Sequence, residues 1–280
     1  MFTRPFGPSK LTLPVIGQGS WQIAEAGRRR EEAKRALRRG IDLGMVHIDT
    51  AEMYGGAEDL IGEAIEGLPR KDLFIISKVL PSNASYKGTI KACDASLRRL
   101  RTDYLDCFLL HWRGSLPLED TMRAFEELVA TGKIRTIGVS NFEIKDIEEA
   151  ERYLSKERIA CNQVLYNLGE RGIERRLIPY CNSHDISVVG YTPFGKIPPP
   201  SSPQGKILQK VAEKHGCTIR QLLLAFLTRD KNLFAIPKAS VVRHVEENAA
   251  ACEIKLDEAD IHALDGAFPA PTEDVPLSML

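Results

Sequence analysis

Short apolar runs, separated by stretches of helical periodicity, recur along the whole chain. Eight of these runs are almost continuously apolar, which is typical of strands that are covered on both faces in a parallel sheet. Between them, apolar residues repeat at helical spacing, for example at Ile90, Cys93 and Leu97. The pattern predicts eight parallel strands alternating with helices. The predicted strands span residues 13–17, 45–49, 73–79, 104–110, 134–140, 159–164, 186–191 and 233–236.

This alternation fits a closed (β/α)8 barrel, which typically has about 250 residues. An open doubly wound sheet is the competing fold, and one that bound a dinucleotide would carry a glycine fingerprint after its first strand. Here Gly17 and Gly19 are followed by Gln22 at the position of the last glycine. We therefore expect an α/β fold of the TIM-barrel class, as a single domain over residues 1–280, with its active site at the carboxyl ends of the strands. Residues 196–205 are expected to form a surface loop, and a candidate flap, after the seventh strand.

Composition and charge narrow the class of protein further. The chain of 280 residues has 38 basic and 38 acidic residues, a balance that lacks the electrostatic footprint of nucleic-acid binding. A basic cluster at residues 28–30 runs directly into two glutamates, which indicates a solvated helix start. No apolar stretch has the length of a membrane span or follows the N-terminus as in a signal peptide. Six cysteines without a CxxC pair lie mostly in apolar periods, as buried thiols do in reducing surroundings. We expect a cytoplasmic protein.

Four ionisable side chains lie where predicted strands end. Asp49, Lys78 and His111 come at the ends of the second, third and fourth strands, and Tyr54 lies in the loop after the second. In a parallel barrel these strand ends open onto one face, so the four side chains are expected to converge.

Their chemistry suits reduction of a carbonyl group. An ammonium close to a phenol lowers the phenol pKa, so Lys78 would make Tyr54 a usable general acid. Asp49 would be the counter-ion of Lys78, whose charge beside a buried strand is costly when unpaired. His111 would donate a hydrogen bond to the substrate oxygen as it becomes negative. No side chain supplies hydride, so a nicotinamide cofactor is required.

Other interpretations of these residues stay open. Asp49 could cap a helix, Tyr54 could be a loop aromatic and His111 a core histidine. A metal-dependent hydrolase would use His47 and Asp49, two residues apart on one strand, with His111 and His184 as further ligands. A non-enzymatic module that holds a cofactor and binds partners is the third reading, because fold alone does not define function.

At these residues the chain resembles the aldo-keto reductase family. The motifs that carry the resemblance run nearly from end to end, and they lie at residues 17–21, 47–55, 77–78, 110–112, 138–142, 162–163 and 236–238. The resemblance implies an eight-stranded α/β barrel that transfers hydride from NADPH to aldehydes and ketones. It implies that Tyr54 protonates the carbonyl oxygen, that Lys78 and Asp49 tune its pKa, and that His111 orients the substrate.

The same resemblance implies a set of cofactor-binding residues. Ser140, Asn141 and Gln163 would bind the carboxamide, and Tyr191 would stack on the nicotinamide ring. Further residues would lie along the rest of the cofactor, from the start of the barrel past the pyrophosphate to the adenosine end. They are Gly19, Ser20, Trp21, Asp49, Thr192, Pro193, Phe194, Gly195, Ile236, Pro237, Lys238, Ala239, Ser240, Arg243, His244, Glu247 and Asn248.

One departure from the family pattern concerns the 2′-phosphate of NADPH. His244 stands where many members have an arginine, and Ala239 replaces a serine beside Lys238. Arginine offers a permanent charge and a bidentate fork, whereas histidine is mostly neutral at physiological pH. We expect NADPH to be preferred by a reduced margin, with NADH as the second cofactor.

The expected substrate pocket is apolar and open. Trp21, Met53 and Trp112 would form its walls around Tyr54 and His111. The segments at residues 113–118 and 269–280 are short, which favours broad specificity. The pattern resembles bacterial members that reduce small reactive carbonyls such as methylglyoxal or aromatic aldehydes, a role in aldehyde detoxification. We expect a monomer or weak oligomer with a small carbonyl compound as its partner.

Overall fold

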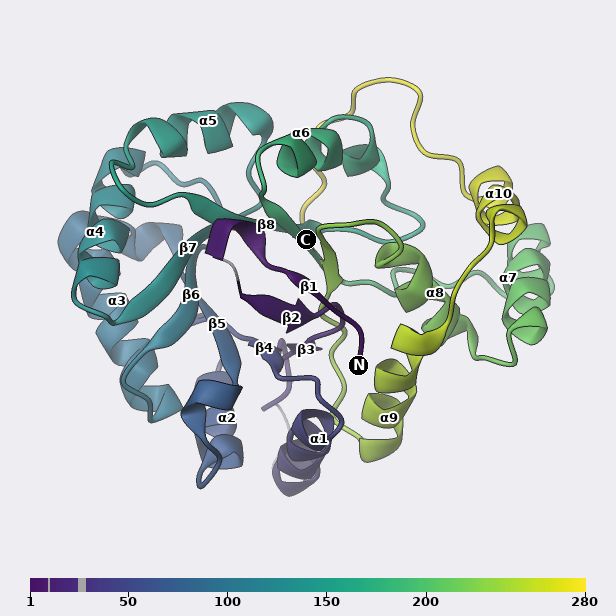
Figure 1. Ribbon diagram of the computed structural model, residues 1–280, viewed down its shortest axis with the longest axis horizontal. Helices are drawn as coiled ribbons and strands as arrows, with labels where there is room; N and C mark the ends of the chain where they lie inside the picture. Colours follow the sequence, from purple (N-terminus) through teal and green to yellow (C-terminus); the bar gives the residue numbers. More distant parts are fainter. Residues whose placement is uncertain (10, 25–28) are drawn as a thin grey trace.

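The computed structural model describes residues 1–9, 11–24 and 29–280. Its centre is a ring of parallel strands that follow one another in chain order (Figure 1). Each strand is hydrogen-bonded to the next one along the chain, as the periodicity predicted. The strands are β3 (Gln18–Gly19), β4 (His47–Asp49), β5 (Phe74–Val79), β6 (Leu105–Leu110), β7 (Ile134–Ser140), β8 (Ile159–Leu165), β9 (Ser187–Tyr191) and β10 (Leu233–Ala235).

The last strand meets the first. Parallel bridges join Ile16 to Ala235 and Gly19 to Lys238. The Gly17 N–H donates to the Ala235 carbonyl at 2.8 Å, and the Ala235 N–H donates to the Val15 carbonyl at 2.9 Å. A Cβ on Gly19 would lie 2.6 Å from the carbonyl oxygen of Ile236, so this close approach requires glycine. The arrangement agrees with the predicted (β/α)8 class.

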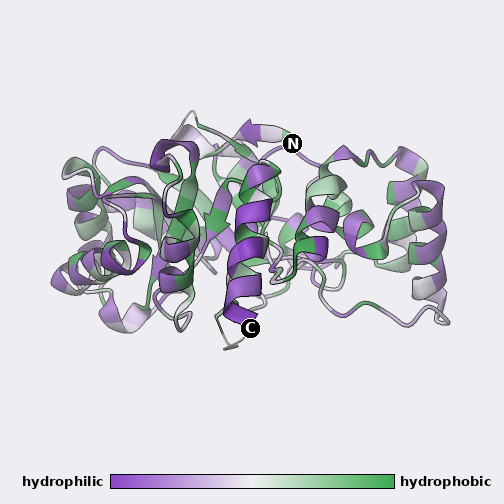
Figure 2. Cartoon of the chain, turned by 90° about the horizontal axis from the view of Figure 1, so that it is seen from below, coloured by the Kyte–Doolittle hydropathy of each residue, from purple (hydrophilic) through white to green (hydrophobic). Residues whose placement is uncertain are grey.

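Helices surround the ring, with hydrophilic faces outward and the hydrophobic strands inside (Figure 2). Their apolar faces and the outer faces of the strands form one large core cluster, and a second cluster fills the ring. None of the helices that the structure describes combines the length and the apolar character that a membrane crossing requires. The helices are α1 (Arg30–Asp42), α2 (Ala57–Ile65), α3 (Tyr86–Leu100), α4 (Leu118–Ala130), α5 (Ile144–Arg152), α6 (Leu177–Ser183), α7 (Pro203–Lys214), α8 (Ile219–Leu227), α9 (Val242–Ala250) and α10 (Glu258–Ala267).

Two predicted segments differ from the structure. Residues 13 and 14 of the first strand, predicted over residues 13–17, belong instead to β2 (Thr12–Pro14), which pairs antiparallel with β1 (Thr3–Pro5). The barrel strand itself is β3, five residues further along. The loop predicted over residues 196–205 ends earlier, because Ser202 caps α7 and Pro203 occupies its first turn. Proline is well suited to this position, since its fixed φ is helical and its missing N–H would have no helical partner.

Two smaller predictions concern the start of the first helix and the burial of the cysteines. The basic cluster at residues 28–30 was expected to open a solvated helix, and α1 begins at Arg30 with Glu31 and Glu32 in its first turn. Arg28 lies outside the described residues. Four of the six cysteines are buried, as expected, and Cys217 and Cys252 are half-buried.

The β1–β2 hairpin covers one end of the ring and the C-terminus lies at the other (Figures 1 and 2). Beneath the hairpin, the fully buried Phe6 packs edge-on against Phe74, Phe234 and His47, with ring centroids 5.1, 5.4 and 6.2 Å away. Burial in this apolar floor, together with the charge of Lys78, lowers the pKa of His47 to about 3. His47 is therefore a neutral side chain of the barrel floor.

The burial of His47 makes the stability of the protein depend on pH. The unfolded chain protonates His47 near its ordinary pKa of 6.5, whereas the folded chain does not until about 3. Because the unfolded state binds more protons between these values, stability falls as the pH falls through this window. Between about pH 7 and about pH 5, His47 should account for a loss of about 2 kcal/mol.

The measurement is urea unfolding of wild type and of His47→Gln at both pH values. The variant should lose less stability on acidification than wild type does. His262→Gln, at an exposed position on α10, is the matched control and should keep the wild-type dependence. Equal losses in wild type and His47→Gln would contradict the assignment.

Candidate active site

The structure brings three of the four predicted catalytic residues to the wall of one cavity. Asp49 ends β4, His111 directly follows β6, and Tyr54 lies in the loop between β4 and α2. All three line a cavity of about 680 Å³. Lys78, near the end of β5, lies beneath them and is fully buried. The convergence that was predicted from the strand ends is therefore seen in the geometry.

Lys78 and Asp49 form a buried ion pair at the bottom of the cavity. The Lys78 Nζ lies 2.7 Å from Asp49 Oδ1 and donates to the Thr50 carbonyl at 2.8 Å. The second carboxylate oxygen of Asp49 accepts from the Gln163 side chain at 2.7 Å. Burial opposes the charge of Lys78, but Asp49 and Tyr54 outweigh it and hold the Lys78 pKa above its ordinary value. The lysine is therefore charged.

Tyr54 stands over this lysine. The Lys78 Nζ is 5.0 Å from the centre of the Tyr54 ring. The prediction that Lys78 lowers the Tyr54 pKa below its ordinary value was wrong for the net effect. Burial raises the Tyr54 pKa, and Lys78 offsets this only in part. Tyr54 is accordingly a protonated phenol, ready to donate rather than to accept a proton.

His111 faces Tyr54 across the cavity floor. Their ring centroids are 5.7 Å apart in an edge-on arrangement. Burial, and then the charge of Lys78, lowers the pKa of His111 to about 3. Its Nδ1 is buried and has no hydrogen-bond partner among the residues that the structure describes. The imidazole is neutral at physiological pH, so any hydrogen bond it donates does not depend on an imidazolium.

A network of amides and hydroxyls forms the next part of the wall. The Tyr191 hydroxyl donates to Asn141 Oδ1 at 2.9 Å, and the Asn141 amide donates to the Ser140 hydroxyl at 3.1 Å. The Ser140 hydroxyl in turn donates to the Gln163 carbonyl at 2.9 Å. Because Gln163 also binds Asp49, the network connects the ends of β7, β8 and β9 to the ion pair.

Several residues of the cavity wall have left-handed backbone conformations, among them Asn141 and Thr192. Asn141 has φ 59° and Thr192 has φ 52°. Asparagine tolerates this region, but a β-branched threonine there is strained. The Thr192 carbonyl accepts hydrogen bonds from the Asn167 amide and from the Gly195 N–H, which hold the turn in place.

The predicted cofactor and substrate residues fall into two groups. Most of them line the cavity together with Asp49, Tyr54 and His111: Gly19, Ser20, Trp21, Met53, Trp112, Ser140, Asn141, Gln163, Tyr191, Thr192, Pro193, Phe194, Gly195, Ile236 and Lys238. The others follow β10 or lie on α9, outside the walls of the cavity: Pro237, Ala239, Ser240, Arg243, His244, Glu247 and Asn248.

Three residues of the wall were missed by sequence reasoning. Gln22 follows the Trp21 motif directly, and Met279 and Leu280 come from the end of the chain. Met279 and Leu280 belong to a segment without helical or strand periodicity, so nothing local in their sequence signals where they lie. Only the position of the whole segment 269–280 in three dimensions shows it.

Only two residues of the metal-hydrolase alternative, Asp49 and His111, line this cavity. The His47 ring lies in the barrel floor against Phe6, and the His184 ring stacks on Tyr180 with centroids 4.0 Å apart. Within the described ranges, no group of three or more His, Cys, Asp or Glu side chains is close enough to hold a metal ion.

Comparison with known proteins identifies the class of this fold and site. The model of the aldo/keto reductase family matches residues 15–198 and 199–268. The chain belongs to the aldo/keto reductase family and is an oxidoreductase, which confirms the resemblance inferred from the motifs.

Among its relatives is the methylglyoxal reductase YeaE of Escherichia coli (strain K12), which is 44% identical over 274 residues, with 96% of each chain covered. The glyoxal reductase of Bacillus subtilis (strain 168) is 32% identical over 258 residues, covering 91% of this chain and 89% of that protein. A crystal structure of an aldo/keto reductase from Klebsiella pneumoniae in complex with NADP and acetate superimposes with a TM-score of 0.93, at 44% identity over 99% of both chains.

Replacing Asp49 tests the buried ion pair. Asp49→Asn leaves the fully buried Lys78 ammonium without its counter-ion, and should lower the free energy of unfolding by about 3–5 kcal/mol. The measurement is urea unfolding at neutral pH. Asp103→Asn removes the same charge from an exposed position and should change stability by no more than about 0.5 kcal/mol. The pair would be shown unimportant if both variants were equally stable.

Proposed function

We propose that this protein reduces small aldehydes and ketones to alcohols with NADPH, with broad specificity that includes methylglyoxal. The observation that carries the proposal is the placement of Tyr54 over the buried Lys78–Asp49 pair, with neutral His111 in the same cavity. The named methylglyoxal and glyoxal reductases among the relatives support the substrate class. We further propose that residues 1–280 act as one catalytic domain, since the ring closes between residues 15–19 and 233–238.

The residues of the wall fit a nicotinamide cofactor. Ser140, Asn141 and Gln163 supply the hydroxyl and amide groups that a carboxamide needs, and Tyr191 supplies an aromatic face beside them. The buried Ser20 hydroxyl, on the same wall, has no partner among the described side chains. A bound nicotinamide supplies the hydride, and structures similar to this chain have been solved with NADP or NADPH.

Each of the four predicted catalytic residues then has a defined task. Tyr54 donates its phenolic proton to the carbonyl oxygen of the substrate, and the Lys78 ammonium stabilises the phenolate that remains. Asp49 fixes the position of Lys78 and keeps it charged. His111, being neutral, donates a hydrogen bond to the same oxygen and orients it as negative charge develops.

The substrate side of the cavity is apolar and open. Trp21 and Met53 are 50% and 45% exposed, and Trp112 packs against His111 with ring centroids 5.0 Å apart. Such walls restrict the orientation of a substrate less than a set of directional hydrogen bonds would. These apolar walls therefore favour the binding of varied small carbonyl compounds.

Cofactor preference is proposed to depend on the start of α9. Arg243 and His244 are both exposed there, and Arg243 Nε lies 3.5 Å from the Glu247 carboxylate. Part of the arginine charge is thus used within the helix. Lys238, which lines the cavity, remains the main cation for a 2′-phosphate, so NADPH is favoured over NADH by a reduced margin.

Removing the Tyr54 hydroxyl tests the proposed proton donor. Tyr54→Phe should lower the turnover of methylglyoxal about 10²–10⁴-fold, while NADPH binding stays within a few-fold of wild type. The measurement follows NADPH absorbance with methylglyoxal and a panel of aldehydes in the presence of EDTA. Tyr153→Phe, which removes an exposed hydroxyl on the surface, is the control. Undiminished turnover in Tyr54→Phe would exclude the role, and no turnover by wild type with any carbonyl would overturn the proposed function.

Adding an arginine tests the cofactor site. His244→Arg should tighten NADPH binding about tenfold relative to NADH, because a guanidinium can bind a 2′-phosphate that NADH lacks. The measurement is the ratio of the two dissociation constants by fluorescence titration. Ala250→Arg adds the same charge at the far end of α9 and should leave the ratio unchanged. Equal tightening of both cofactors by His244→Arg would show that residue 244 does not face the 2′-phosphate.

A further inference from the structure

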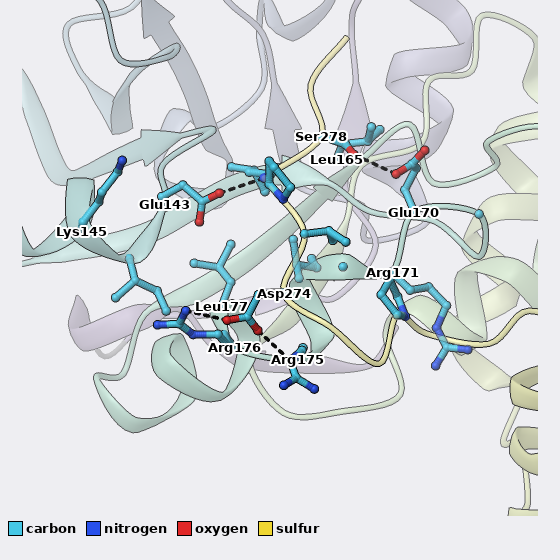
Figure 3. A pocket seen from close by; sticks show the side chains of 18 of the residues that line it. Glu143, Lys145, Leu165, Glu170, Arg171, Arg175, Arg176, Leu177, Asp274 and Ser278 are labelled. Carbon is cyan, nitrogen blue, oxygen red and sulfur yellow. Dashed lines mark hydrogen bonds and ion pairs between the residues drawn. The ribbon is translucent and has the colours of Figure 1, made fainter.

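Carboxylates hold two of the segments that line the active-site cavity. In the C-terminal segment 269–280, Asp274 is paired with two exposed arginines at 2.6 and 2.9 Å, beside a second cavity of about 680 Å³ (Figure 3). The other segment is residues 50–56, here called the tyrosine loop because it carries Tyr54. Its carboxylate, that of Glu52, binds donors of the loop that follows β5. How the tyrosine loop is held bears directly on the chemistry, since Tyr54 is the proposed proton donor.

The end of β5 lies between the backbones of the two loops that carry Tyr54 and His111. Strand β5 pairs with β4 on one side and with β6 on the other. Beyond β4, the Glu52 N–H donates to the Lys78 carbonyl at 3.2 Å. Beyond β6, the His111 N–H donates to the Val79 carbonyl at 3.0 Å. Two successive residues of β5 therefore fix where both loops start.

The Glu52 side chain extends this connection beyond the strand. Its carboxylate accepts the Leu80 N–H at 2.5 Å and the Asn83 side-chain amide at 3.1 and 3.2 Å. These donors belong to a short 3₁₀ turn between β5 and α3, which spans Pro81–Asn83 and has Leu80 as its N-cap. Hydrogen bonds to a carboxylate are roughly twice as strong as those between neutral groups. Glu52 is thus a firm link from the tyrosine loop to this turn.

The same turn also packs against the loop that follows β6. A Cβ on Gly114 would lie 2.5 Å from the Cβ of Pro81, so the two loops are in close contact at this point. Directly after the turn, the Ala84 carbonyl accepts the hydroxyl of Thr121, on α4, at 2.6 Å. The turn is therefore fixed to the elements around β6. Through Glu52, the tyrosine loop is fastened to the same elements.

We propose that Glu52 is a positioning residue, which sets the place of the Tyr54 hydroxyl relative to His111 through the turn Pro81–Asn83. The proposal rests on the proposed carbonyl reduction, in which Tyr54 and His111 both bind the substrate oxygen. A displacement of about 1 Å in such a pair lowers turnover by up to about 10²-fold. Without the carboxylate, the tyrosine loop keeps its backbone bond to Lys78 but loses its connection to the turn.

The test compares kcat for methylglyoxal with the dissociation constant of NADPH. Glu52→Ala should lower kcat about tenfold or more, while KM and the NADPH dissociation constant stay within about twofold of wild type. Glu52→Gln keeps a side-chain oxygen for the Leu80 N–H and should restore most of the kcat. Glu126→Ala is the matched control, because the Glu126 carboxylate also accepts backbone N–H groups, those of Ser155 and Lys156 at 2.7 Å, but lies outside the cavity wall. It should keep the wild-type kcat.

A milder variant changes the other side of the link. Asn83→Ala alters only an exposed side chain, and it should lower kcat about two- to fivefold. Combined with Glu52→Ala, it should lower kcat no further, because both changes break the same contact. Equal kcat in Glu52→Ala and Glu126→Ala, or an NADPH affinity that falls as much as kcat does, would overturn the positioning role.

Hydrogen exchange gives a readout that is independent of turnover. The Tyr54 N–H donates to the Ala51 carbonyl at 3.0 Å, a bond that does not involve the Glu52 carboxylate. In Glu52→Ala this amide should nevertheless exchange several-fold faster than in wild type and in Glu126→Ala. Unchanged exchange would contradict the proposal even in an active enzyme. If wild type reduced no carbonyl, the proposed function would fail, while exchange would still decide whether Glu52 fastens the tyrosine loop.

Discussion

The buried ion pair between Lys78 and Asp49 is the constraint on which the site depends. Removing both charges from water is costly, and the cost is offset by their mutual attraction and by the hydrogen bonds that each makes to further groups. The Thr50 carbonyl accepts a second hydrogen bond from the Lys78 ammonium, and the Gln163 amide donates one to the second carboxylate oxygen of Asp49. Since these partners come from β4, β5 and β8, the pair can form only when those strands have their correct register. The chemistry and the fold are therefore specified by the same contacts.

Closure of the ring extends this constraint to the rest of the wall. The approach of Gly19 to β10 leaves no room for a side chain, and it places Ser20 and Trp21 beside the segment that contains Lys238. Opposite them, the register of β7 against β8 sets Ser140 beside Gln163. Residues that are more than two hundred positions apart thus meet at one end of the barrel. A short β3 suffices, because the bridges from Ile16 to Ala235 and from Gly19 to Lys238 complete a ring whose other strands are already paired.

The sequence was informative where a structural feature depends on residues that are close together along the chain. The position of Lys78 at the end of an apolar strand predicted that its charge would need a counter-ion, and Asp49 is its partner in the structure. Strand order followed from the alternation with helices. The first strand was placed too early because Leu13 is as apolar as a residue of a barrel strand, although it pairs with Arg4 in the β1–β2 hairpin. The Tyr54 pKa was misjudged because sequence gives its charged neighbour but not its depth. Met279 and Leu280 were missed because only long-range contacts place them.

The two parts of the cavity differ in how firmly they are held. The inner part of the cavity consists of side chains on strand ends. Hydrogen bonds leave little freedom to Asp49, Gln163 and Ser140 there. The rim of the cavity consists of exposed side chains on loops and on the C-terminal segment 269–280, including Trp21, Met53 and Met279. Proton transfer requires fixed distances, whereas accepting substrates of different shape requires walls that adapt at small cost. A rigid inner part beneath an adaptable rim satisfies both requirements. This arrangement follows from the position of the charged groups on the barrel strands and of the apolar ones on the loops.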